Sequence, residues 1–86
     1  MPFNKDEIRN LLSFLEKKYP ATYEDIDALK KEAPPQINPD ELFRNLLFCR
    51  EEGFINCSPI AEEARGIVDL KYIKITSKGI RFLSNF

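Results

Sequence analysis

Histidine and tryptophan are absent from this 86-residue chain, which also has only two cysteines and three glycines. Without histidine, the two cysteines, Cys49 and Cys57, cannot complete a four-ligand zinc site. The chain shows no glycine-rich phosphate loop and no nucleophile beside a general base. These absences predict a protein that is not an enzyme and that has no metal and no cofactor. In a reducing compartment both thiols are expected to stay unpaired.

Long hydrophobic runs are also missing. No apolar stretch approaches the roughly 20 residues that a membrane span needs, and the N-terminal "MPFNKDEIRN" lacks the apolar core of a signal peptide. We therefore expect a cytoplasmic protein without a membrane partner. The length predicts one small domain over residues 1–86.

Charge is unevenly distributed, although the net charge is only −1. Residues 19–63 contain four basic and ten acidic side chains, whereas residues 64–86 contain five basic side chains and one acid. A basic C-terminal quarter is compatible with phosphate contacts, and an acidic middle with a protein partner.

Two helices are predicted in the N-terminal half. Asn4 can cap the first, with Glu7 completing a capping box and Phe3 and Ile8 as a hydrophobic staple. Leucines continue the apolar face, and Pro20 ends the helix. The second helix is shorter: it is predicted to be capped by Thr22 and to end before the Pro34–Pro35 pair.

The clearest helix signal lies in "INPDELFRNLLFCREEGFI", residues 37–55. Asn38 is the predicted cap, Pro39 fits the first helical position, and Gly53 fits the left-handed turn that ends a helix. The predicted inner stripe consists of Leu42, Leu46 and Cys49.

Alternating patterns then predict two strands, 54–60 and 69–75, joined by a hairpin tip or a short helical insertion around Gly66. In the second strand, alternation places Lys71, Ile73 and Ile75 on one face. The opposite face would carry Leu70, Tyr72 and Lys74. Thr76 is the predicted cap of a last short helix, with Leu83 docked inward. Three helices, a hairpin and a short helix predict an α+β winged-helix domain.

The stretch "NPDELFRNLLFCREEGFI" followed by "YIKITSKGIRFL" resembles the small winged-helix proteins of the YjcQ type from bacteria and phage, which are mostly uncharacterised. The closing phrase, Ile75-Thr76 with Gly79, Phe82 and Leu83, is also similar to winged-helix regulators of the PadR and MarR kinds. The resemblance covers residues 38–83 and, less closely, the first 20 residues, and it implies DNA binding through the third helix and the wing. We expect a regulatory protein of prophage origin that acts as a dimer.

Two alternatives follow for function. In the first, Arg44 and Asn45 contact base edges of duplex DNA, while Lys71, Lys74 and Lys78 contact phosphates. In the second, the domain is a protein-interaction or dimerisation module that uses Phe43 and Phe48 on an acidic third helix. The long turn "KEAPPQINP" and the acids of the third helix depart from a DNA-binding pattern. A solvated helix face and lysines that protect a strand edge would explain the same charges without any partner.

Overall fold

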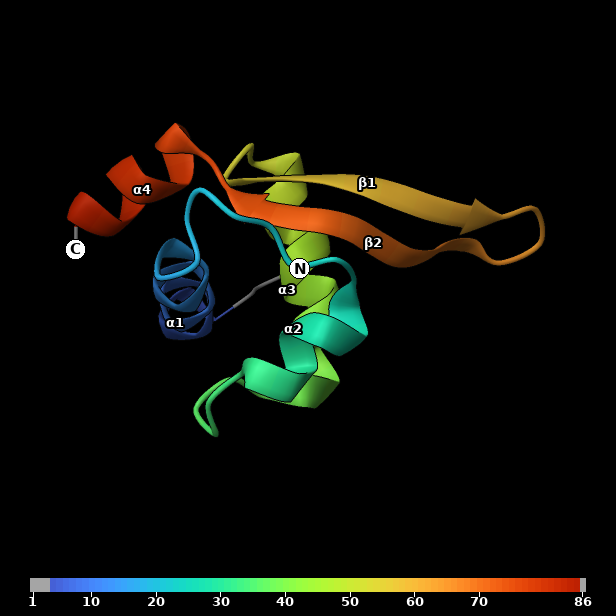
Figure 1. Cartoon of the computed structure of the whole chain (residues 1–86), viewed down its shortest axis with the longest axis horizontal. Coiled ribbons are helices and arrows are strands. Elements are labelled where there is room, and N and C mark those ends of the chain that lie inside the picture. Colours follow the sequence, from blue (N-terminus) through green and yellow to red (C-terminus); the bar gives the residue numbers. More distant parts are fainter. Residues whose placement is uncertain (1–3, 86) are drawn as a thin grey trace.

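The computed structural model describes residues 4–85, which form four helices and one two-stranded antiparallel hairpin. The elements in chain order are α1 (Lys5–Glu16), α2 (Ile26–Glu32), α3 (Pro39–Glu51), β1 (Ile55–Glu62), β2 (Gly66–Ile75) and α4 (Ser77–Ser84). The hairpin projects well beyond the helices (Figure 1). This mixed α+β arrangement confirms the predicted order of elements and is compatible with a winged-helix layout.

Helix α1 supplies the central apolar face of the core. The Asn4 side chain caps it by accepting a hydrogen bond from the Glu7 N–H at 3.1 Å, as predicted. Its buried residues recur at one side of the helix: Ile8, Leu11, Leu12 and Leu15. Helix α3, strand β2 and helix α4 all pack against α1. The predicted staple partner Phe3 lies outside the described residues.

Helix α2 starts later than the sequence predicted, because its N-cap is Asp25 and not Thr22. Tyr23 forms a β-bridge instead: it exchanges two backbone hydrogen bonds with Ile73, at 2.9 and 2.8 Å. The segment before α2 therefore pairs with the free edge of β2. A helix that began at Thr22 would lose this pairing.

Helix α3 agrees closely with its sequence signals. The Asn38 side chain accepts a hydrogen bond from the Asp40 N–H at 2.9 Å, and Pro39 occupies the first turn. Gly53 turns the chain with a φ of +79°. The predicted inner stripe is confirmed, since it is fully buried against the core: Leu42, Leu46 and Cys49.

The hairpin has longer strands than predicted, and its tip is a tight turn at residues 63–65 without helix. The predicted faces of β2 were correct for Ile73 and Ile75, which are both fully buried, but wrong for Leu70 and Tyr72. Leu70 is fully buried, whereas Tyr72 is 59% exposed. The register gains one residue in β2 between Lys71 and Lys74, which is a β-bulge, and Tyr72 adopts a left-handed φ of 56° there. The bulge shifts the alternation that the sequence pattern assumed.

Helix α4 is joined to the end of α3 by a threonine. Thr76 caps α4 by accepting a hydrogen bond from the Gly79 N–H at 3.1 Å, and its hydroxyl donates to the Gly53 carbonyl at 2.6 Å. Gly79 is buried under Phe54 and Ile75, where a side chain would collide with them. Leu83 packs against the core, as predicted.

Candidate nucleic-acid interface

Helix α3 offers little for reading bases. Arg44 is exposed, but its guanidinium forms an ion pair with Glu41 at 2.7 Å. The prediction that Asn45 faces outward was wrong: it is 6% exposed, and its side-chain amide donates to the Glu7 carboxylate at 3.3 Å. Asn45 lies on the side of α3 that faces α1, so this amide joins the two helices. Of the two predicted base-contacting residues, only Arg44 is accessible.

The predicted contact residues Phe43 and Phe48 are half-buried and pack against the core. Phe48 meets Phe54 edge to face, with ring centroids 6.4 Å apart. Leu47, which lies between these two residues in the sequence, is also half-buried. Around these apolar groups α3 and its C-cap carry four carboxylates against two arginines. Helix α3 therefore presents a partly apolar surface with an acidic rim, which repels phosphate.

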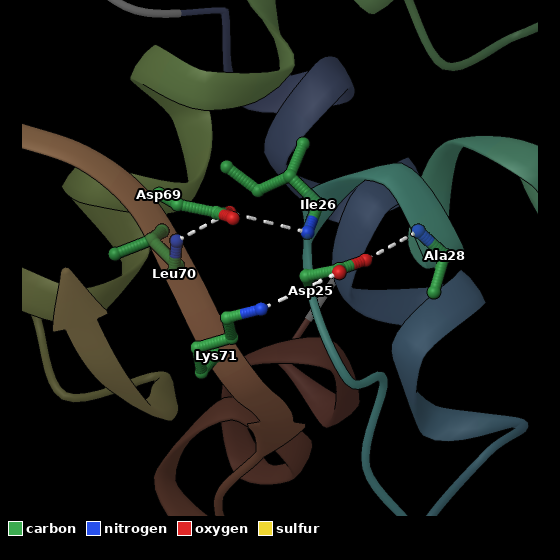
Figure 2. Close-up of polar contacts among 6 residues, drawn as sticks. All are labelled: Asp25, Ile26, Ala28, Asp69, Leu70 and Lys71. Atoms are coloured by element: carbon green, nitrogen blue, oxygen red, sulfur yellow. Dashed lines mark hydrogen bonds and ion pairs between the residues drawn. The ribbon is translucent and has the colours of Figure 1, made fainter.

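Lys71 is occupied within the fold. Its ammonium group lies 3.5 Å from a carboxylate oxygen of Asp25, whose other oxygen accepts from the Ala28 N–H and caps α2 (Figure 2). This hydrogen bond, more than the nearby Lys71, lowers the pKa of the Asp25 carboxyl. Asp69 accepts from the Ile26 N–H at 3.5 Å beside this pair. Through this ion pair Lys71 links β2 to the N-cap of α2, and it is therefore a poor candidate for a phosphate contact.

Lys74 and Lys78 are brought together. Both line one open hollow where the hairpin meets α4, together with Tyr19, Asn56 and Ser77. No carboxylate of residues 4–85 lines this hollow or forms an ion pair with either lysine. The structure therefore concentrates uncompensated positive charge at the base of the hairpin. Arg44 does not line this hollow.

Two residues of this region were missed by the sequence analysis. Arg81 is exposed one turn beyond Lys78 on α4, and both line a second hollow beside Phe54. Tyr19 is 46% exposed, and the ammonium group of Lys74 lies 5.8 Å from its ring centroid. The i, i+3 spacing of Lys78 and Arg81 could have revealed the first. Nothing in the sequence links Tyr19 to a strand more than fifty residues away.

The hairpin tip itself is not basic. Arg65 pairs with Glu62 at 3.1 Å, and Glu63 lies between them in the turn. The positive charge of the C-terminal quarter is therefore concentrated at the base of the hairpin and on α4. A contact with nucleic acid would use that end of the hairpin.

The two cysteines are unpaired and poorly suited to nucleophilic chemistry. Burial raises the pKa of the Cys49 thiol to about 12. Burial also raises the pKa of Cys57, although the charge of Arg50 opposes this shift. Both thiols are thus protonated at neutral pH, and the thiolate is the reactive form.

Within residues 4–85, no group of three or more histidine, cysteine, aspartate or glutamate side chains is placed to hold a metal ion. The helices of this part of the chain are too short and too polar to cross a membrane.

Comparisons with protein-family models, with curated proteins and with solved structures give no match for this chain. The resemblance to the YjcQ type therefore stays a prediction.

Proposed function

We propose that this chain is a small winged-helix protein that binds DNA and acts in regulation. The order of its elements supports this fold, and so does the single β-bridge through which Tyr23 pairs with the free edge of β2. Fold alone supports many functions, so the proposal depends on the surface.

The observation that carries the proposal is the pairing of Lys74 and Lys78 in one hollow without a carboxylate. Cationic side chains that neutralise phosphates release counterions, and this release supplies most non-specific affinity for DNA. Arg81 adds a third cationic side chain one turn further along α4. We name the surface formed by Lys74, Lys78 and Arg81 the basic strip.

Helix α3 has a smaller part in this proposal than the sequence suggested. Arg44 would have to exchange its 2.7 Å ion pair with Glu41 for a base edge or a phosphate. Asp40, Glu51 and Glu52 would lie near the phosphate backbone if α3 entered a major groove deeply. DNA binding would therefore depend mainly on backbone contacts and show weak sequence preference.

The test is fluorescence anisotropy of a short duplex of arbitrary sequence, over a series of salt concentrations. The double variant Lys74→Glu/Lys78→Glu is expected to weaken binding strongly and to reduce the slope of log K against log salt by about 2, one per lost phosphate contact. Lys30→Glu/Lys31→Glu is the matched control, because it makes the same charge change at exposed positions of α2.

Equal loss in both double variants would mean that only net charge matters, and the basic strip would be refuted as a site. Wild-type protein that does not bind duplex or single-stranded DNA at low salt would refute the DNA proposal as a whole.

A second candidate function is a protein-interaction or dimerisation module, favoured by the surface of α3. Its half-buried apolar side chains lie among four carboxylates, a composition that suits a protein partner better than DNA. Sedimentation velocity over a wide concentration range tests the dimer form of this idea. Self-association that Glu51→Lys/Glu52→Lys abolishes would support it, and a monomer at all concentrations would exclude the dimer.

A further inference from the structure

We propose that the hollow at the base of the hairpin binds an unpaired nucleotide, with the base stacked on Tyr19 and the phosphates held by Lys74 and Lys78. The chain would then prefer single-stranded nucleic acid to a duplex. This inference rests on the phosphate contacts of the proposed function and goes further, because it names the form of nucleic acid that the site selects.

Tyr19 has the exposure and the support that a stacking platform needs. The residue is 46% exposed, and it lies in a hydrogen-bonded turn after α1. In that turn the Tyr19 N–H donates to the Glu16 carbonyl at 3.1 Å, and the Ala21 N–H donates to the Lys18 carbonyl at 2.9 Å. A held backbone and an exposed ring reduce the ordering that a stacked ligand would otherwise require.

Aromatic and cationic groups are interleaved at this site. The Lys74 ammonium lies 5.8 Å from the Tyr19 ring centroid, and Lys78 lines the same hollow. The Lys74 ammonium lies over one face of this ring, so a base would stack on the other face or displace Lys74 from the ring, and the two ammonium groups would then bind its phosphates. Proteins that bind single strands combine these two features, a positively charged groove and aromatic rings on which bases stack.

Polar side chains complete the hollow without adding negative charge. Asn56 is exposed opposite Lys74 in the hairpin register, and Ser77 is exposed at the first position of α4. An amide and a hydroxyl can hydrogen-bond to the edge of an unpaired base. In a duplex the faces of the bases are stacked on one another, so Tyr19 would have no partner. The phosphate contacts alone would remain for duplex DNA.

The experiment compares three probes by anisotropy or competition: oligothymidylate, a duplex of the same length, and inorganic polyphosphate. Wild-type protein is expected to bind oligothymidylate more tightly than the duplex. Tyr19→Ala is expected to weaken oligothymidylate binding by roughly 5- to 150-fold, the range for loss of one stacked base. It should leave polyphosphate binding unchanged, and Tyr19→Phe should bind like the wild type.

Tyr72→Ala is the matched control, because Tyr72 is also an exposed tyrosine but does not line the hollow. It should bind oligothymidylate like the wild type. Equal affinity for single strand and duplex, with no effect of Tyr19→Ala, would overturn this inference. If Lys74→Glu/Lys78→Glu still abolished binding in that case, the proposed function would stand without it. Wild-type protein that binds neither form of DNA would overturn both.

Discussion

Tyr72 is the one non-glycine residue among residues 4–85 that has a positive φ. A left-handed φ of 56° costs a bulky residue about 1–2 kcal/mol. The hydrogen bonds around the bulge offset this cost: the Tyr72 N–H donates to the Glu24 carbonyl at 3.1 Å, and Ile73 pairs with Tyr23. The bulge therefore lets β2 pair with β1 on one edge and with residues 23–24 on the other.

Substitution at Tyr72 should show this strain directly. Asparagine tolerates the left-handed region, so Tyr72→Asn is expected to leave the free energy of unfolding unchanged or to raise it by up to about 1 kcal/mol. Tyr72→Val should lower it by about 1 kcal/mol or more, because a β-branched residue fits this region poorly. Urea unfolding of both variants checks the prediction. A more stable valine variant would show that the bulge is not strained.

Asn45 shows a limit of sequence reasoning at single residues. A polar residue on an amphipathic helix is expected to face solvent, and periodicity cannot tell that α1 covers that side of α3. The partner that satisfies Asn45 is Glu7, thirty-eight positions earlier in the chain. A buried polar side chain needs such a partner, but the sequence does not identify it.

At the scale of elements, the caps were the most predictable features. Asn4, Asn38 and Thr76 all accept the expected hydrogen bonds, and Gly53 turns left-handed, because these signals depend on neighbours within a few residues. The start of α2 and the faces of β2 could not be predicted. The start of α2 depends on the pairing of Tyr23 with a strand fifty residues away, and the faces of β2 depend on the bulge between Lys71 and Lys74.

In the candidate site, too, only some of the residues could be predicted from the sequence. Lys74 and Lys78 were selected by local charge, whereas Lys71, only three residues from Lys74, forms an ion pair with Asp25. Tyr19 joins the site only through tertiary packing. Charge patterns therefore indicated the region but could not show which side chains converge in it.

The close packing of α4 against Phe54 and Ile75 depends on Gly79, because this position leaves no room for a side chain. A Cβ at Gly79 would collide with the Phe54 carbonyl oxygen and lie 2.7 Å from the Ile75 side chain. Gly79→Ala is therefore expected to lower the free energy of unfolding by about 3 kcal/mol, as overpacking of a rigid site does. Thermal unfolding of the variant measures this loss.

Gly66 provides the comparison for that variant. It has a φ of +74°, but an added Cβ would meet nothing within 4 Å. Gly66→Ala should cost only about 1 kcal/mol, from backbone strain alone. If the two alanine variants were equally stable, close packing of α4 would not be the reason for glycine at position 79.

At the scale of the whole molecule, Tyr23 joins three parts of the fold. Its ring stacks on Phe14 of α1 with centroids 5.4 Å apart, its backbone pairs with Ile73 of β2, and its hydroxyl donates to Glu32 of α2 at 3.3 Å. The residue is only 4% exposed. Burial, and then the nearby Glu32 carboxylate, raises the pKa of Tyr23 to about 12.

This shift predicts a pH dependence of stability. The folded pKa lies above the unfolded value of about 10, so folding favours the protonated phenol. Its contribution is fully present below pH 10 and is lost as the pH rises from about 10 to 12. The stability difference between wild type and Tyr23→Phe should therefore decrease over this range, measured by urea unfolding at each pH. A constant difference would show that the phenol does not titrate in this way.

The pairing of Tyr23 with Ile73 also has a consequence for synthesis on the ribosome. Helix α1 and the segment after it emerge first, but β2, which covers them, is translated roughly fifty to sixty residues later. At 5–20 residues per second this delay is on the order of 3 to 12 seconds. During that time the four buried apolar side chains of α1 lack the β2 residues against which they pack in the folded protein. The nascent chain should therefore be exposed to chaperones and proteases until its last quarter has left the exit tunnel.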